Sequence, residues 1–156
     1  MRKFVSSVWA SVLLAAALPF VSTQVAAAED QPPSLVETYD YPGADQIFAL
    51  RGIRLLKGDG HILLVDCVSG TGQAEVWSRS KGHICFDVRG ATGALTMEIP
   101  ETYLLLGAGG HNIAATLVID GVTSSVTVLK NEFRGIGESG PAAKPAVLLE
   151  FHATAA

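Results

Sequence analysis

Charged residues are scarce in this sequence. They make up 17% of its 156 residues, while hydrophobic residues make up 49%. Disordered chains have the opposite balance, so this composition predicts a folded protein. Acidic residues outnumber basic ones, 15 to 11, which leaves no excess of positive charge for a nucleic acid. We therefore expect no nucleic-acid partner.

Long hydrophobic runs are absent except at the N-terminus. There, Arg2 and Lys3 precede residues 4–20, which carry no charge, and small residues follow up to Ala28. This arrangement is typical of a secretory signal peptide, and we expect cleavage after Ala28. A retained membrane anchor is the alternative, but a run of 17 residues that contains Pro19 is short for one. After cleavage we expect no stable membrane insertion.

The remaining chain is short and rich in glycine. Removal of residues 1–28 would leave 128 residues with a net charge of -6 and all 16 glycines. This length fits one domain, and the glycine content indicates many tight turns. The Ala-rich signal and the lack of Asn-X-Ser/Thr sequons point to a bacterial source. The lack of an Arg-Arg pair in the signal favours export of an unfolded chain.

Helical periodicity is also lacking. No window beyond residue 28 keeps hydrophobic residues at helical spacing for three turns. Short hydrophobic runs instead alternate with turn residues, so we expect residues 47–156 to form a single-domain, all-β antiparallel sandwich of about 7–9 short strands. Residues 29–46, which contain Pro32, Pro33 and Pro42, are expected to form an extended N-terminal arm.

Local signals place some of the strands. Asp-Gly pairs at Asp59 and at Asp120 each lie between two hydrophobic runs and predict hairpins. Residues 79–82 separate two further strands in the same way. Residues 94–99 alternate between hydrophobic and polar side chains, which predicts a half-buried strand that ends at Pro100.

The only two cysteines, Cys67 and Cys85, are expected to form a disulfide after export. In a simple meander they would lie two strands apart, about 9.6 Å. A disulfide spans at most about 7 Å between Cα atoms. Either the strand order is not a meander, or the bridge joins strand ends or opposite sheets. Because Cys85 shares a face with His83 rather than with Phe86, we expect the bridge at a rim or an edge.

Several sequence motifs of known chemical sites occur here without the structural context that those sites require. Residues 135–140 read Gly-x-Gly-x-x-Gly, but prolines follow where a nucleotide-binding helix would have to begin. Residues 78–81 read Ser-x-x-Lys, yet they lie in a predicted turn and lack the partner motifs of penicillin-recognising enzymes. His61, His83 and the other two histidines form no metal-ligand motif. We expect no metal, no cofactor and no recognisable catalytic residue.

Three stretches could bind a partner. The segment 101–111 runs from an aromatic residue and leucines into flexible glycines, although a buried strand with a glycine turn is the simpler interpretation. The segment 130–144 is a second candidate surface. Trp77, near Arg79 in the sequence, is a third, although a half-buried strand tryptophan is the simpler explanation. The candidate binding residues are Trp77, Arg79, Tyr103, Leu105, His111, Phe133 and Arg134.

These features favour a small secreted or cell-envelope protein that binds an extracellular or cell-envelope protein or glycan without catalysis. One alternative is a small hydrolase, which would need a carboxylate within hydrogen-bond reach of His61, His83 or His111 in a cleft. Another is an inhibitor of a secreted hydrolase, which would need residues 107–110 to form a protruding, rigid loop.

Overall fold

The computed structural model describes residues 39–156. The predicted signal peptide, residues 1–28, and residues 29–38 of the predicted arm lie outside the described residues. The described elements are, in chain order, β1 (Tyr39–Asp40), α1 (Ala44–Arg51), β2 (Arg54–Gly58), β3 (Ile62–Val65), β4 (Ala74–Ser78), β5 (Gly82–Val88), β6 (Thr92–Leu106), β7 (His111–Ile119), β8 (Val122–Val128), β9 (Phe133–Gly135), the 3-10 helix η1 (Gly137–Ser139) and β10 (Ala146–Ala155).

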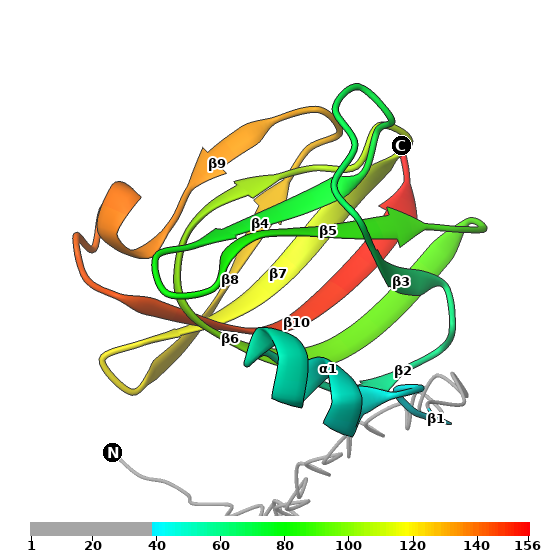
Figure 1. The fold of residues 1–156 in the computed structure, drawn as a ribbon. Helices are drawn as coiled ribbons and strands as arrows, with labels where there is room; N and C mark the ends of the chain where they lie inside the picture. The colour runs from blue at the N-terminus through cyan, green and yellow to red at the C-terminus, as the bar shows by residue number, and fades with distance from the viewer. Residues whose placement is uncertain (1–38) are drawn as a thin grey trace, which may run out of the picture. The chain divides into compact units, whose positions relative to one another are not determined.

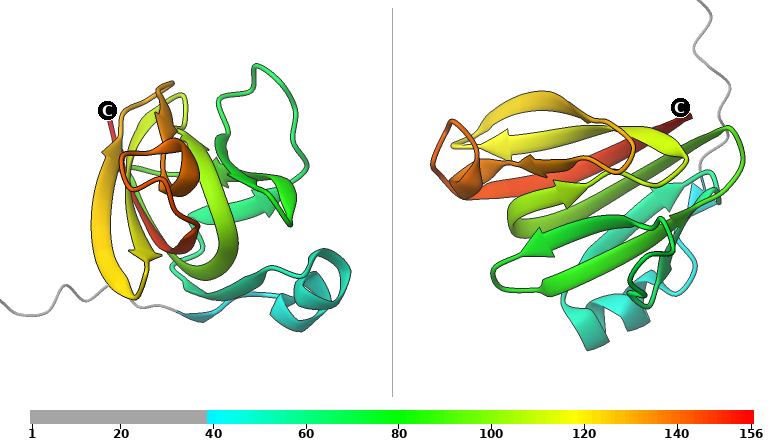
Figure 2. Two further views of the ribbon diagram at one scale, coloured as in Figure 1. Left: turned by 90° about the vertical axis from the view of Figure 1, so that its left-hand side faces the viewer. Right: turned by 90° about the horizontal axis from the view of Figure 1, so that it is seen from above.

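The strands form one antiparallel sheet (Figure 1). The main order is β3-β5-β4-β6-β10-β7-β8, while β2 and β9 also pair with β6, and β1 pairs with β2. The sheet is open and strongly curved (Figure 2). The predicted all-β antiparallel fold with one disulfide is thus confirmed. A sandwich is not confirmed, because the ten strands described belong to one continuous sheet, and they exceed the expected 7–9.

The 15-residue strand β6 carries the curvature. Its first part pairs with β2 and β10, and its second part pairs with β4 and β9. Between these parts the strand bends at Pro100 and Glu101, and Glu101 has a φ of 49°. The prediction that the strand ends at Pro100 is wrong. The missing amide hydrogen of proline is tolerated there because the bend lies between the end of the β2 ladder and the start of the β4 ladder.

Two buried hydroxyl groups hold the bend. Ser78 Oγ donates to the Pro100 carbonyl at 2.6 Å, and Thr102 Oγ1 donates to the Ile99 carbonyl at 3.0 Å. Arg79 adds a backbone N–H bond of 3.0 Å to the Glu101 carbonyl. The carbonyls exposed by the bend are therefore satisfied within the fold.

The hydrophobic core fills the inner side of the curved sheet. Alternation along β6 buries Leu95, Met97 and Ile99, as the sequence predicted. Phe86 and Phe151 meet edge to face near its middle, with ring centroids 6.0 Å apart. The largest fully buried side chains are Phe86, Phe151, Ile53, Leu55, Ile62, Leu95, Met97, Ile99, Leu105, Ile113, Leu148 and Val76.

The predicted disulfide between Cys67 and Cys85 is present, with Cα atoms 5.2 Å apart. The strand order is not a meander, because β5 lies between β3 and β4. Cys67 follows the end of β3, which pairs directly with β5, and this brings it beside Cys85. Since β3 stands at one end of the strand order, the bridge fixes an edge of the sheet, as expected.

The expectation that the chain has no helix is wrong, because α1 spans Ala44–Arg51. This helix is short and buries none of its residues, so it leaves no amphipathic pattern in the sequence. It ends at Gly52, whose φ of 64° is a common helix C-cap conformation. The predicted extended arm is also incorrect in its described part, since Tyr41 packs against the core and its hydroxyl accepts the Leu64 N–H at 2.6 Å.

The two Asp-Gly signals have different outcomes. Asp120 and its glycine connect β7 to β8 in a hairpin, with φ values of 52° and 76° that fit a type I′ turn. The predicted hairpin at Asp59 is wrong, because β2 pairs with β6 while β3 pairs with β5. Asp59 instead binds β6, accepting the Ala94 N–H at 2.9 Å, and this contact directs the chain away from β2. The predicted hairpin at 79–82 is confirmed by the pairing of β4 with β5.

Candidate functional site

Hydrophobic side chains gather on the outer side of β4, β6 and β9. Trp77 lies opposite Leu104, and Leu106 lies opposite Phe133, so these four residues share one side of the sheet. Their neighbours Val76 and Leu105 face the core. We call the set Trp77, Tyr103, Leu104, Leu106 and Phe133 the aromatic face.

A β-bulge adds Tyr103 to this face. The pairing of β4 with β6 shifts between Trp77, which opposes Leu104, and Ser78, which opposes Thr102, so Tyr103 is the extra residue. Its ring meets that of Trp77 edge to face, with centroids 6.4 Å apart. The guanidinium of Arg79 lies over the Tyr103 ring at 4.1 Å. The bulge therefore assembles an aromatic pair with a cation stacked on it.

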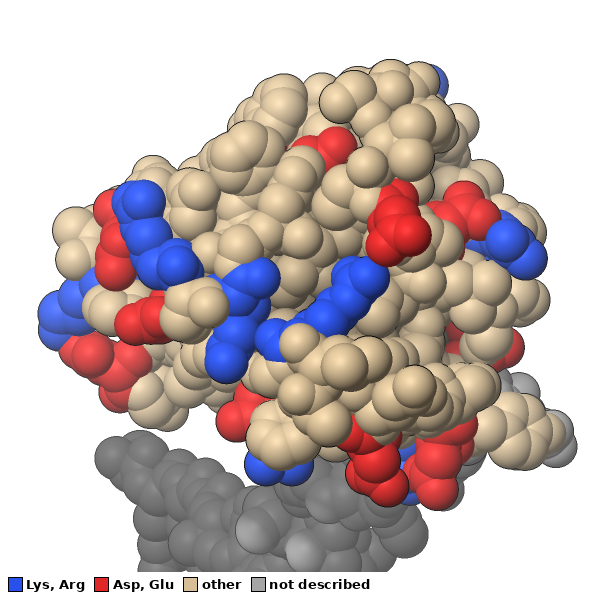
Figure 3. Space-filling view, in the orientation of Figure 1, with Lys and Arg blue, Asp and Glu red and all other residues tan. Residues whose placement is uncertain are grey.

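The aromatic face is partly open to solvent in the described part of the chain. Phe133 is 60% exposed, and the other four side chains are partly exposed. Figure 3 shows a broad, mostly uncharged area with a few acidic atoms in it above a band of basic side chains. A solvated sheet face normally carries polar side chains, so a cluster of five hydrophobic ones indicates a contact surface.

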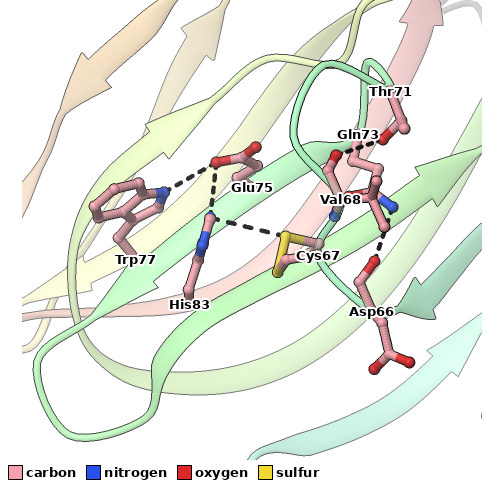
Figure 4. A network of polar contacts seen from close by, with 9 residues as sticks. Asp66, Cys67, Val68, Thr71, Gln73, Glu75, Trp77 and His83 are labelled. Atoms are coloured by element: carbon pink, nitrogen blue, oxygen red, sulfur yellow. Dashed lines mark hydrogen bonds and ion pairs between the residues drawn. A yellow bond between two sulfur atoms is a disulfide. The ribbon is translucent and has the colours of Figure 1, made fainter.

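A polar network adjoins this face (Figure 4). The carboxylate of Glu75, on β4, accepts a bond from Trp77 Nε1 at 3.2 Å and contacts His83 Nε2 at 2.7 Å. His83 Nε2 lies 3.8 Å from the sulfur of Cys85. Glu75, Trp77, His83 and Cys85 occupy alternate positions on two paired strands, which is why they all project from the same side.

The Glu75 and His83 pair meets the distance condition of the hydrolase hypothesis. The two side chains are 15% and 38% exposed, and His83 lines a hollow of about 530 Å³ with Lys81 and Cys67. The described contacts of the His83 side chain are with Glu75, Trp77 and Cys85, and none of these supplies a hydroxyl nucleophile. Ser80 lines the same hollow, but within residues 39–156 no described hydrogen bond joins its hydroxyl to His83, as a Ser-His-carboxylate site would require.

The histidines of the other two carboxylate–histidine pairs are more exposed than His83. His61 Nδ1 lies 3.4 Å from Asp59, whose carboxylate also binds the Ala94 amide. His152 Nε2 lies 3.0 Å from Glu150, and both residues belong to β10. We interpret these pairs as part of the solvated outer surface.

The structure brings together only some of the predicted binding residues. Tyr103 contacts both Trp77 and Arg79, and Phe133 lies on the same side, two strands from Trp77. Leu105 is 1% exposed and belongs to the core, so it is not available to a partner.

The remaining two predicted residues lie outside the aromatic face. His111 is bonded through Nε2 to the Gly90 carbonyl at 2.7 Å, at the start of β7. Arg134 pairs with Glu132 at 3.0 Å and lies opposite Leu105 in the pairing of β9 with β6.

Leu104, Leu106 and Glu75 were not among the candidate binding residues, and His83 was considered only for the hydrolase hypothesis. Strand alternation was the available signal, since each lies two positions from another residue of the site or network. It could not be used because the pairing of β4 with β6 depends on a bulge that no local pattern marks. The register of the β4–β5 hairpin alone would have placed Trp77 beside His83.

Residues 107–110 do not form a protruding loop. Gly107 and Ala108 are buried, and Gly109 donates a backbone bond of 2.9 Å to the Gly72 carbonyl. A Cβ on Gly107 would overlap the Leu129 carbonyl. The segment therefore lacks the protrusion that the inhibitor hypothesis requires.

Comparison with known proteins gives no further guide. No model of a protein family matches the chain, and no curated protein matches it significantly. Within residues 39–156, no helix combines the length and the hydrophobicity that a membrane span requires. The described geometry is thus the basis for assigning a function.

Proposed function

We propose that this protein is an exported, non-catalytic binding protein that engages a partner through the aromatic face. The observation that carries the proposal is the cluster of five hydrophobic side chains on a solvated side of the sheet. Arg79 stands at its rim, stacked on Tyr103 and paired with Glu138 at 3.1 Å. Tryptophan, tyrosine and arginine are the residues that contribute most to binding energy at protein interfaces.

The partner that fits best is a protein rather than a glycan. A sugar stacks on an aromatic ring whose face is open, whereas Arg79 covers one face of Tyr103 and His83 lies 4.5 Å from the Trp77 ring centroid. The leucines and Phe133 extend the surface sideways as a hydrophobic patch. An open sheet face of this kind suits a second protein surface of matching shape.

Export and an extracellular or cell-envelope location belong to the same proposal. The charge pattern of residues 1–28 supports them, and a disulfide is consistent with an oxidising compartment. A bacterial source is proposed on the composition of that segment. These features would place the aromatic face where it can meet partners outside the cytoplasm.

Quantitative capture from the culture supernatant and the cell envelope tests the proposal. The double variant Leu106→Thr with Phe133→Ser removes exposed hydrophobic groups, and we expect it to bind the captured partner about tenfold or more weakly. Val122→Thr is the matched control, because Val122 is 65% exposed but lies on β8. Circular dichroism confirms that both variants fold.

Three results would contradict the proposal. Equal binding by the double variant and the parent chain would exclude the aromatic face as the contact surface. Binding of a purified envelope glycan, reduced in the same variant, would replace the protein partner with a glycan. Hydrolytic activity that is lost in His83→Gln would favour the enzyme instead.

A further inference from the structure

The disulfide and the neighbouring His83 contain side chains of the types that bind metals. Three possible ligand atoms lie within 4.8 Å of one another: the sulfur of Cys67, the sulfur of Cys85 and a ring nitrogen of His83. Thiolate and imidazole are the ligands that zinc prefers. In the disulfide the sulfurs are bonded to each other and neither is a thiolate, so the site can exist only after reduction.

The positions of His83 and Cys85 already match a tetrahedral site. Zinc–ligand distances of about 2.3 Å to sulfur and about 2.1 Å to nitrogen place those two ligand atoms about 3.6 Å apart. His83 Nε2 and Cys85 Sγ lie 3.8 Å apart. Both residues are held by the ladder between β4 and β5, so their spacing does not depend on the bridge.

Cys67 is held near them by contacts other than the bridge. Gln73 bonds the backbone on both sides of Cys67, since its Nε2 donates to the Asp66 carbonyl and its Oε1 accepts the Val68 N–H, both at 3.0 Å. Thr71 Oγ1 donates to the Val68 carbonyl at 2.8 Å (Figure 4). After reduction these bonds keep the Cys67 thiol close to Cys85.

Glu75 supplies a fourth group. Its Oε2 lies 2.7 Å from His83 Nε2 and accepts the bond that a cation at Nε2 would replace. The carboxylate is 15% exposed, and among the three ligand residues its described contact is with His83. Two thiolates, an imidazole and an adjacent carboxylate favour zinc over magnesium or calcium, which prefer oxygen ligands.

We propose that the dithiol form of this chain binds one zinc-like divalent cation through Cys67, His83 and Cys85, with Glu75 beside the fourth position. An external dithiol reduces the bridge, giving two cysteine thiols and the disulfide of the reductant. Cation binding then releases the two thiol protons to solvent, while the imidazole proton moves to Nδ1 by exchange with solvent. Because bonded sulfurs cannot ligate as thiolates, the disulfide and the cation exclude each other.

Cobalt(II) is the probe for the test, because thiolate ligation gives it charge-transfer absorption. The complete chain is reduced with a phosphine, titrated with Co²⁺ and compared with the oxidised chain. We expect one equivalent bound by the reduced chain, displacement by Zn²⁺, and no thiolate absorption from the oxidised chain. Cys67→Ser should lower the charge-transfer absorption per bound Co²⁺ to that of a single thiolate or less.

Two histidine variants make the test specific. We expect His83→Ala to weaken binding about tenfold or more. His152→Ala is the matched control, since His152 is also a strand histidine paired with a glutamate, and it should bind as the parent chain does. Equal affinity in His83→Ala and the parent would overturn the proposal, as would a reduced chain that binds no Co²⁺.

Circular dichroism of the reduced chain completes the test. A native spectrum, or one that stoichiometric Co²⁺ restores, supports the proposal. A reduced chain that is unfolded and stays unfolded with Co²⁺ overturns it. The result is independent of the proposed binding function, because Leu106→Thr with Phe133→Ser leaves all four groups of the metal site in place.

Discussion

At the scale of single residues, the curvature of the sheet depends on two buried polar side chains. Ser78 and Thr102 are the polar residues that the described part of the chain buries, and each bonds a carbonyl at the bend of β6. Ser78 Oγ also accepts the Lys81 N–H at 3.1 Å. One hydroxyl thus connects the bend of β6 to the turn between β4 and β5, close to the aromatic face.

Replacement of Ser78 by alanine should destabilise the fold. It leaves the Pro100 carbonyl and the Lys81 N–H without this partner, and we expect a loss of about 1–3 kcal/mol in the free energy of unfolding. Urea denaturation monitored by circular dichroism measures it. Ser124→Ala, on the exposed surface of β8, is the control and should change the value by less than about 0.5 kcal/mol. Equal stability of the two variants would show that the bend does not need the hydroxyl.

At the scale of elements, α1 is the part of the fold with the least tertiary support. It has eight residues and buries none, and Leu50 is 77% exposed. Isolated helices of this length are marginal in water. Its described supports are Ile47, which packs against the core, Arg51, paired with Asp66 at 3.0 Å, and Phe48, on which Arg54 stacks at 4.1 Å.

We therefore expect the amides of α1 to exchange with solvent faster than those of β6, β7 and β10. These three strands have partners on both sides or in the core, so their amides should open only with much of the sheet. Hydrogen exchange with mass spectrometry of peptides covering residues 44–51 and 111–119 measures the difference. Equal protection of the two peptides would contradict this assignment.

The helix α1 is an element that the sequence pattern could not predict. The strand at residues 94–99 was predictable because its alternating sequence shows which side is buried. The helix α1 buries none of its residues, so its sequence has no such pattern. The signal at Asp59 was misread because its carboxylate binds Ala94, 35 residues away. Trp77 with Arg79 and the segment containing Tyr103 were recognised as separate candidates, but the contact of Tyr103 with both depends on the bulge in β6. Long-range register, rather than residue type, was the missing information.

At the scale of the whole molecule, the proposed export makes a direct prediction. We expect the purified extracellular protein to begin at Glu29, because small residues at Ala26 and Ala28 suit the signal peptidase. N-terminal sequencing and the intact mass check this result. A secreted protein that retains residues 1–28 would contradict it, and so would a chain that stays in the cytoplasm.

The central position of β10 also determines when the protein can fold. This strand, residues 146–155, lies between β6 and β7, so in the described strand order β7 and β8 join the other strands through it. During synthesis, β6 and β7 are complete long before the strand that joins them exists. We expect stable assembly to wait for β10, because without it β6 and β7 lack the partner that they share. An export route that requires unfolded chains would thus receive this one before it could fold.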